Sequence, residues 1–281
     1  MAAKAVETLR AYLRSLPGTD AAVAFSGGVD SAVVLRAALD VFPGAVYAVF
    51  FKTALHPAAE LEEARSLAQG MGARFTCVTV DELREAGIEN NPPDRCYRCK
   101  RLLFSKLRDF AAGHGVPLLL DGTNADDLNE YRPGLRALSE IGVVSPLARL
   151  GLTKAQVRAI AEAEELRVAH KPSSPCLATR VEYHTPLRAE DLSAIAKGEE
   201  TLRAMGFTAV RVRLHNRLAR VEVAGEDIPR AAAESYQISA ALRELGFYYV
   251  TLDLEGLRSG SMDLMLDSQE KEAALHGRLP E

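Results

Sequence analysis

The stretch S-G-G-V-D-S occupies residues 26–31, between the apolar run A-A-V-A-F and the helix-patterned run A-V-V-L-R-A-A-L. This order predicts a strand, a tight loop and a helix. Two adjacent glycines let the backbone turn sharply and approach a ligand, and the N-terminus of the following helix attracts anions. The loop contains no lysine, unlike the loop G-x-x-x-x-G-K-S/T, whose lysine reaches the outer phosphates. We therefore expect a pyrophosphate site and a reaction other than simple phosphoryl transfer; a ligand-free glycine turn is the alternative.

Strand and helix patterns alternate through the first 170 residues. Apolar runs at residues 45–51, 73–80 and 116–121 predict further strands, and residues 143–147 predict a short fifth strand. Such alternation favours an α/β fold with a parallel sheet, in which ligands lie at the carboxyl ends of the strands. A second polar loop, D-G-T-N-A-D-D at residues 121–127, follows the fourth run. We expect this loop to share a cleft with the first one, and a simple polar turn is the alternative.

The pattern changes in the second part of the chain. Residues 171–185 have no sustained periodicity and predict a linker loop, which carries Cys176. Residues 186–266 combine helix patterns at 189–205 and 228–245 with short alternating runs, which predicts a smaller α+β domain for substrate binding or oligomerisation. Residues 267–281 are charged and predict a flexible tail. The four predicted parts are thus a domain over residues 1–170, the linker, the smaller domain and the tail.

Composition limits the class of partner. The formal net charge is −4, so the chain has no basic excess of the kind that holds nucleic acid, and we expect no nucleic-acid partner. The sequence shows no signal-peptide pattern and no run of 18 apolar residues, which predicts a cytoplasmic protein without a membrane partner. Four cysteines in such a chain are expected to be reduced, metal-bound or catalytic rather than disulfide-bonded.

Three of the cysteines stand in polar surroundings. C-Y-R-C at residues 96–99 follows the loop N-N-P-P and precedes a helix pattern from about residue 100. This spacing brings two sulfurs to one side and suits two ligands of one metal or cluster, or a redox dithiol; two incidental thiols are the alternative. Cys176 lies after the prolines at 172 and 175 and is the better nucleophile candidate. Cys77 falls within an alternating strand, and we expect it in the core.

The loop at residues 26–31 resembles the S-G-G-x-D-S hallmark of the PP-loop ATP pyrophosphatases. The resemblance implies an adenine nucleotide alpha hydrolase-like domain that cleaves ATP between the α and β phosphates and adenylylates a substrate. It implies that the backbone around Ser26, Gly27, Gly28 and Ser31 holds the departing pyrophosphate. Asp30 would help to place Mg²⁺, which prefers oxygen ligands.

Two further stretches narrow the resemblance: S-P-C-L-A-T-R at residues 174–180 and R-S-G-S-M at residues 258–262. With the loop, they are similar over nearly the full length to the ATP-dependent sacrificial sulfur transferases called LarE. That family implies a pyridinium dicarboxylate mononucleotide as small-molecule substrate. Its carboxyl group is converted to a thiocarboxylate on the way to the nickel-pincer nucleotide cofactor of lactate racemase. The family also implies a homo-oligomer, with the hexamer as its known form.

The cysteines decide which branch of the family the chain resembles. In single-cysteine members, the equivalent of Cys176 loses its own sulfur and is left as dehydroalanine. This chain also carries Cys96 and Cys99, and so resembles a second group in which three cysteines hold a [4Fe-4S] cluster. The resemblance implies that Cys96, Cys99 and Cys176 bind a cluster that carries the transferred sulfide. Cys176 is the predicted catalytic residue, and its sacrifice is the alternative.

The remaining polar candidates come from residue patterns. Arg211 and Arg213 are two apart on a predicted strand and face one side, which suits a clamp for the substrate phosphate; a solvated strand face is the alternative. Asp126 and Arg180 are candidates for contacts with nucleotide or substrate. Three acids are candidates for a second divalent ion, although such acids are usually solvated: Glu199, Glu200 and Glu222.

Competing functions stay open at this point. A tRNA thiolase also pairs this loop with cysteines, but the acidic balance and the absence of an RNA-binding module count against it. Amide-forming relatives would not need the three cysteines. A nucleotide-binding or cluster-bearing regulator without turnover belongs to a different class. Release of pyrophosphate from ATP would distinguish an enzyme from such a regulator.

Overall fold

The computed structural model describes residues 2–57, 59–129, 134–172, 175–258 and 260–276. The chain divides into two compact units. One comprises Met1–Ala86, Asp94–Ser173 and Glu272–Glu281, and the other comprises Gly87–Pro93 and Ser174–Lys271. The segment Gly87–Pro93 therefore leaves the first unit and the chain returns to it at Asp94.

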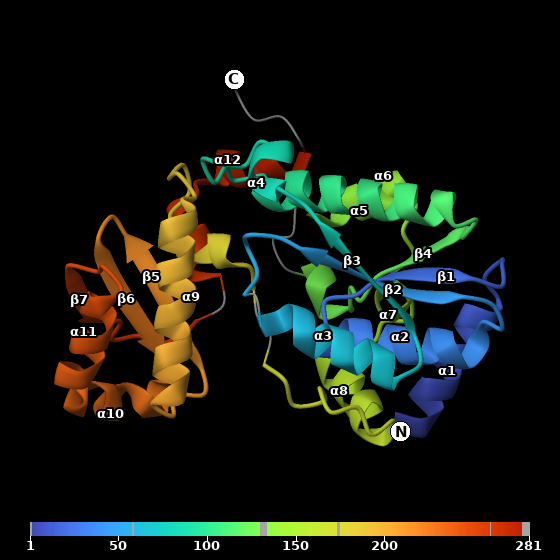
Figure 1. Ribbon diagram of the computed structural model, residues 1–281, viewed down its shortest axis with the longest axis horizontal. Helices are drawn as coiled ribbons and strands as arrows, with labels where there is room; N and C mark the ends of the chain where they lie inside the picture. The colour runs from blue at the N-terminus through green and yellow to red at the C-terminus, as the bar shows by residue number, and fades with distance from the viewer. Residues whose placement is uncertain (1, 58, 130–133, 173–174, 259, 277–281) are drawn as a thin grey trace. The chain divides into compact units, whose positions relative to one another are not determined.

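The first unit contains a four-stranded parallel sheet. Its strands are β1 (Ala21–Ala24), β2 (Val46–Lys52), β3 (Arg74–Thr79) and β4 (Leu118–Leu120), in the order β3-β2-β1-β4 (Figure 1). Ala21 pairs with Val46 on one side and with Leu118 on the other. The predicted α/β fold with a parallel sheet is thus confirmed.

Helices cover both faces of this sheet (Figure 1). On one face lie α1, α2, α3, α7 and α8, and on the other lie α5 and α6. The helices of this unit are α1 (Ala2–Arg14), α2 (Val29–Val41), α3 (Ala59–Gly70), α4 (Glu82–Glu85), α5 (Arg95–Gly113), α6 (Gly134–Ile141), α7 (Pro146–Arg149) and α8 (Lys154–Ala163), with a 3₁₀ turn η1 (Asp126–Asn129).

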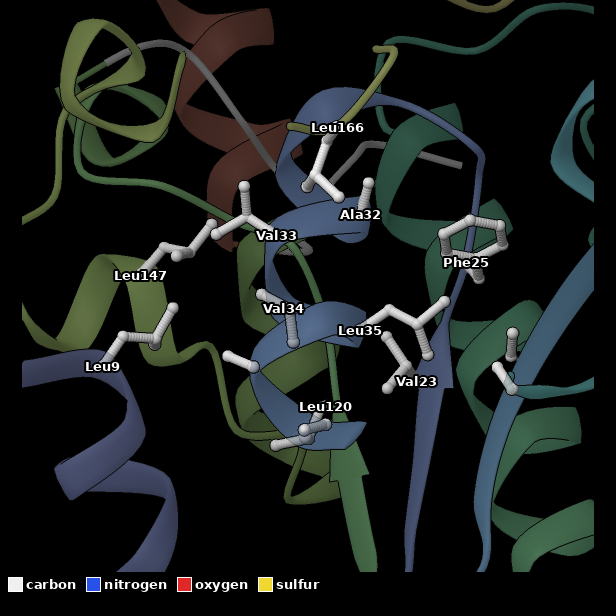
Figure 2. Packing of buried hydrophobic residues seen from close by; sticks show 14 of the residues in the cluster. Leu9, Val23, Phe25, Ala32, Val33, Val34, Leu35, Leu120, Leu147 and Leu166 are labelled. Atoms are coloured by element: carbon white, nitrogen blue, oxygen red, sulfur yellow. The ribbon is translucent and has the colours of Figure 1, made fainter. Parts of the chain in front are cut away.

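The helix that follows the S-G-G-V-D-S loop is the centre of the core. Eight residues of α2 are buried, because it contacts β1 on one side and α1 and α8 on others. Figure 2 shows Leu35 of α2 beside Val23 of β1, while Val33 and Leu147 lie on another side of the helix. A helix that is apolar nearly all round is fixed by its neighbours. The loop at its N-terminus therefore rests on a rigid support.

The second unit contains a three-stranded sheet, β5 (Val210–His215), β6 (Leu218–Val223) and β7 (Tyr249–Leu252). β5 and β6 are antiparallel, and β6 and β7 are parallel. Its helices are α9 (Ala189–Ala204), α10 (Ile228–Ala233) and α11 (Ser235–Glu244), with 3₁₀ turns η2 (Leu177–Arg180), η3 (Gly225–Asp227) and η4 (Ser261–Met265). The predicted smaller α+β domain is confirmed.

The two faces of this small sheet differ in chemistry. Val212 pairs with Val221 on a face that packs against α9 and α11, where a Cβ on Gly198 would lie 3.5 Å from Val212. On the opposite face Arg211 pairs with Glu222. The strict alternation along β5 thus gives one apolar and one charged face.

Four predicted boundaries differ from the structure. Residues 143–147 form no strand: Val144 makes one bridge to Leu120, and α7 starts at Pro146, which suits a first helical position. The helix expected over 228–245 is divided at Glu234 into α10 and α11. C-Y-R-C does not precede a helix but lies in the first turn of α5, after Asp94. The expected tail contains α12 (Ser268–His276), in which Ala274 is buried.

A helix that spans a bilayer needs about 20 predominantly apolar residues. Within the ranges that the structure describes, none combines the length and apolar character needed to span a membrane.

Candidate active site

The S-G-G-V-D-S loop is shaped by its glycines. Gly27 has a φ of 73°, a left-handed conformation that favours glycine, and an added Cβ would lie 2.9 Å from the Cβ of Ala64. Gly28 is the N-cap of α2 and supplies no side-chain cap. The first N–H groups of α2 are therefore available to an anion. The hydroxyl of Ser31 donates to the carbonyl of Gly28 at 3.1 Å and lies 3.3 Å from the hydroxyl of Ser26.

Asp30 lies at the start of α2, and both of its oxygens have partners. Oδ1 accepts a hydrogen bond from Nδ2 of Asn124 at 3.2 Å, and Oδ2 contacts the ammonium group of Lys154. Lys154 is the first residue of α8. Thr153, the N-cap, and Gln156, in the first turn, form a capping box that fixes this helix start. A lysine thus lies at the loop after all, delivered by another helix. The sequence T-K-A-Q predicts a capped helix start, but nothing in it predicts that Lys154 lies at this loop.

The second polar loop contacts the first. Gly122 lies so close that an added Cβ would be 2.7 Å from the backbone nitrogen of Ser31. Asp126 accepts a hydrogen bond from the backbone N–H of Lys154 at 2.8 Å, and its own N–H donates to Oδ1 of Asn124 at 2.9 Å. The structure therefore brings Asp30 and Asp126 to one place through Asn124 and Lys154. Asp126 thus holds the start of α8, and its predicted contact with nucleotide or substrate stays a prediction.

The donor set at this loop fits Mg²⁺. Asp30 offers hard carboxylate oxygens at the carboxyl end of β1, which is what Mg²⁺ prefers when substrate phosphates provide its other ligands. A single protein carboxylate is enough for such a site. Lys154, which contacts Oδ2 of Asp30, would add a positive charge for the phosphates at the same place.

Cys96 and Cys99 lie in the first turn of α5, three residues apart and both partly buried. Residues at this spacing share one side of a helix. The turn is held by α6: a Cβ on Gly134 would lie 3.1 Å from the carbonyl of Cys96. Tyr97 donates to Glu140 at 2.8 Å, and the guanidinium of Arg136 stacks 3.6 Å above the Tyr97 ring. Two thiols in a fixed turn fit two ligands of an iron–sulfur cluster.

The predicted third ligand of the cluster belongs to the other unit. Cys176 belongs to the second unit, whereas Cys96 and Cys99 belong to the first. Over the described ranges, no three histidine, cysteine or acidic side chains converge as a ready metal site. The residues therefore fit part of the proposed ligand set.

Cys176 is partly buried at the start of η2, and its backbone is firmly held. Its carbonyl accepts hydrogen bonds from the N–H of Thr179 at 3.1 Å, from the Thr179 hydroxyl at 2.8 Å and from Nη1 of Arg180 at 3.3 Å. The same Nη1 donates to the carbonyl of Pro175 at 2.7 Å. Arg180 thus holds the backbone of the cysteine loop, and its predicted contact with nucleotide or substrate stays a prediction.

Two buried ion pairs support this region. Arg180 forms a double hydrogen bond with Glu199, at 2.8 and 3.2 Å, and both side chains are 3% exposed. Arg213 pairs with Glu222, and these side chains are 2% and 1% exposed. The alternative of a solvated strand face is therefore wrong for Arg213, as is the expectation of solvated acids at 199 and 222. Pairing with an opposite charge reduces the free-energy cost of burying such groups.

Arg211 differs from these two arginines. Its Nη1 donates to the backbone carbonyl of Arg258 at 3.0 Å, and the described contacts include no ion pair for it. Burial lowers the pKa of Arg211, and the positive charges of Arg180 and Arg213 lower it further. A guanidinium disfavoured in this way gains most from an anionic ligand. The two arginines of the predicted clamp therefore differ in their partners. Arg213 is paired with Glu222, whereas the described contacts of Arg211 include no carboxylate.

Known proteins resemble this chain along its length. The family model of NAD synthase matches residues 1–96, which contain the S-G-G-V-D-S loop. Pyridinium-3,5-bisthiocarboxylic acid mononucleotide synthase of Lactiplantibacillus plantarum is 40% identical over 257 residues, which cover 91% of this chain and 92% of that protein. The chain belongs to the LarE family. An uncharacterised protein of Synechocystis is 37% identical, over 93% of this chain and 97% of its own length. One from Methanocaldococcus jannaschii is 32% identical, over 84% of this chain and 90% of its own length.

The prediction that the chain is a LarE family member is thus confirmed, and so is the prediction of an ATP-dependent enzyme with a PP-loop. It favours sulfur transfer over the tRNA thiolase and over the regulator without turnover. The roles of individual residues, including the three cysteines, stay predictions.

Proposed function

We propose that this enzyme adenylylates a carboxyl group of a pyridinium dicarboxylate mononucleotide and converts it to a thiocarboxylate, in the formation of the nickel-pincer nucleotide cofactor of lactate racemase. The observation that carries the proposal is the similarity along nearly the whole chain to a synthase named for a bisthiocarboxylic acid mononucleotide. The geometry of the loop and of the cysteine region supplies a role for each group.

In the first step, a carboxylate oxygen of the substrate attacks the α-phosphorus of ATP. The bond from this phosphorus to the bridging oxygen breaks, and pyrophosphate leaves with the electron pair. The N–H groups at the start of α2 and the hydroxyls of Ser26 and Ser31 would bind it, since both lie in the S-G-G-V-D-S loop. Lys154 adds a positive charge beside the loop. A charge fixed in advance stabilises the leaving group without reorganisation.

Mg²⁺ would be held by Asp30 together with phosphate oxygens. When bound, it supplies charge neutralisation on the phosphates. Asn124 keeps its hydrogen bond to Oδ1 and so orients the carboxylate.

The substrate's phosphate would bind at Arg211. This guanidinium is partly buried, whereas Arg180 and Arg213 are already neutralised by Glu199 and Glu222. The bidentate fork of an arginine suits a phosphate. The two buried pairs fix the backbone around Arg211 and leave its charge for the ligand.

The sulfur comes from one of two sources. Cys96, Cys99 and Cys176 would hold a [4Fe-4S] cluster, which when bound supplies a renewable sulfide to the activated carboxyl carbon. Without a cluster, the thiolate of Cys176 attacks that carbon and AMP leaves, giving a thioester. Removal of the Cα proton of Cys176 and cleavage of its Cβ–S bond then release the thiocarboxylate and leave dehydroalanine. We favour the cluster, because a sacrificial route needs neither Cys96 nor Cys99.

The test starts from anaerobic purification with iron and sulfide analysis of the wild type and of Cys96→Ala, Cys99→Ala and Cys176→Ala. Cys77→Ala is the matched control, because Cys77 lies in β3. We expect the first three variants to lose iron and the control to keep it. Full iron in all three would overturn the ligand assignment. Loss of one H₂S from the protein mass after turnover would support sacrifice of Cys176. The absence of substrate-dependent pyrophosphate release would overturn the proposed function itself.

We also propose that the protein is a homo-oligomer, with the hexamer as the expected form. The second unit exposes large apolar side chains, which a subunit interface would cover. Among the described residues these include Tyr236, Tyr248, Tyr249 and Leu254. Native mass spectrometry measures the number of subunits.

A further inference from the structure

Asn91 is a fully buried polar residue in the second unit, in the excursion Gly87–Pro93. Its φ of 49° places it in the left-handed region, which asparagine tolerates better than most residues. The excursion has no regular secondary structure, and α5 begins soon afterwards at Arg95. A buried amide in a strained backbone conformation needs an explanation, because both features carry a free-energy cost.

The side-chain amide of Asn91 is bonded to the turn that follows Cys176. Its Nδ2 donates to the carbonyls of Ala178 at 3.3 Å, Val181 at 2.8 Å and Glu182 at 3.0 Å. Three carbonyl oxygens converging on one atom identify it as the NH₂ group, so the orientation of the amide is settled by its partners. These residues form η2 and the segment directly after it.

The backbone of the excursion reinforces this contact. The carbonyl of Asn91 accepts a hydrogen bond from the N–H of His184 at 3.1 Å, and the carbonyl of Glu89 accepts one from the N–H of Leu187 at 2.7 Å. The turn after Cys176 is thus closed from two sides. Arg180 and Thr179 hold the carbonyl of Cys176 from within, and Asn91 holds residues 178–182 from outside.

We infer that Asn91 is a positioning residue for Cys176. It touches neither sulfur nor a proposed substrate group, and it acts by fixing the turn whose first residue is Cys176. The inference rests on the proposed function in one respect: that function gives the reason why Cys176 must be held in a fixed position.

Asn91→Gly separates side-chain bonding from backbone strain, because glycine keeps the positive φ and removes the amide. Asn91→Asp keeps the shape and replaces a donor by an acceptor that faces three carbonyls. The matched control is Asn90→Gly, the same change at the exposed neighbour. For each protein, the alkylation rate of every cysteine is measured by peptide mass spectrometry under anaerobic conditions, together with the melting temperature and iron content.

We expect alkylation of Cys176 to become about tenfold faster in Asn91→Gly, because the lost hydrogen bonds let its turn open more often. Cys77 should keep its rate, and Asn90→Gly should match the wild type. In turnover, kcat should fall while KM for ATP stays unchanged. Asn91→Asp should produce the same pattern; if one of the two variants fails to fold, the other decides.

An unchanged rate at Cys176 in Asn91→Gly would overturn the inference. An equal increase at all four cysteines would overturn it too, since that pattern reports general unfolding. The labelling needs no substrate and so is independent of the reaction. A specific response of Cys176 in a protein that shows no sulfur transfer would leave the positioning role intact and make the proposed function wrong.

Discussion

The ammonium group of Lys154 contacts the carboxylate of Asp30, although 124 positions separate the two residues in the chain. The contact joins the starts of two helices, α2 and α8, which pack on the same face of the parallel sheet. A phosphate loop without its own lysine therefore receives one from a later helix. In the proposed reaction, this lysine would neutralise the leaving pyrophosphate.

Replacement of Lys154 by methionine tests this role. We expect Lys154→Met to keep the aliphatic stem and the fold, and to reduce the rate of pyrophosphate release by about a hundredfold, the usual effect of removing one preorganised charge from a transition state. Lys106→Met is the control, because Lys106 pairs with Glu85 away from the loop. A phosphate-release assay with ATP and substrate measures both. Equal rates in the two variants would show that Lys154 only neutralises Asp30.

Gly122 is the point where the two polar loops touch. A Cβ at this position would lie 2.7 Å from the nitrogen of Ser31 and 3.0 Å from the carbonyl carbon of Asp30, and both neighbours are backbone atoms that cannot move aside. We expect Gly122→Ala to displace the phosphate loop and weaken ATP binding by at least about tenfold, measured by calorimetry. Gly113→Ala is the control, since its Cβ would meet nothing within 4 Å. ATP affinity equal to wild type in Gly122→Ala would contradict this account.

Local sequence signals predicted the first half of the fold well, because each strand and helix of the sheet domain carries its own apolar pattern. The run at residues 21–25, the glycine loop and α2 needed no distant information. Lys154 was missed because its role depends on a packing contact between helices. The apolar pattern V-V-S-P-L at residues 143–147 predicts a strand, whereas Pro146 starts a helix.

Burial of charge was the harder part to predict in the second unit. Arg213 and Glu222 alternate with valines, a pattern that is equally typical of a half-exposed strand. Their burial depends on η4 and the Cys176 turn, which lie far away in sequence: Arg213 donates to Ser261 and to the carbonyl of Thr179, both at 2.7 Å. The packing of residues 87–93 is hard to predict for the same reason, because Asn91 bonds to Val181, about ninety positions later.

The Arg180–Glu199 pair should be critical for folding. Glu199→Met leaves the charge of Arg180 buried without a counter-ion, and we expect a loss of about 3–5 kcal/mol in the free energy of unfolding, measured by urea denaturation. The double variant Arg180→Met with Glu199→Met should recover part of that loss and still be inactive, because Cys176 loses its hydrogen bond from Arg180.

An exposed pair provides the control for this measurement. Arg14 and Glu7 are 53% and 61% exposed, so Arg14→Met should change the free energy of unfolding by less than about 1 kcal/mol. A double variant as unstable as Glu199→Met would contradict the explanation, since no buried charge would remain to account for the loss.

The stability of the fold should depend on pH through Asp20, the residue before β1. Its carboxylate accepts hydrogen bonds from the hydroxyl of Thr19 at 2.6 Å and from the N–H of Ala45 at 2.5 Å, and these bonds lower the pKa of Asp20 in the folded protein. A lowered pKa stabilises the fold at pH values above the unfolded pKa of about 3.9, and this contribution disappears as the pH falls through the folded value. At pH 7 the wild type should therefore be more stable than Asp20→Asn, and the difference should vanish in acid.

Thr19→Val should reduce this pH dependence without abolishing it, because the bond from Ala45 remains. Urea denaturation of the three proteins at pH 7 and at several values below pH 4 measures the effect. If the wild type and Asp20→Asn lost stability with the same slope below pH 4, Asp20 would not be held by these bonds. The link that it forms between the starts of β1 and β2 would then contribute nothing to the sheet that supports the phosphate loop.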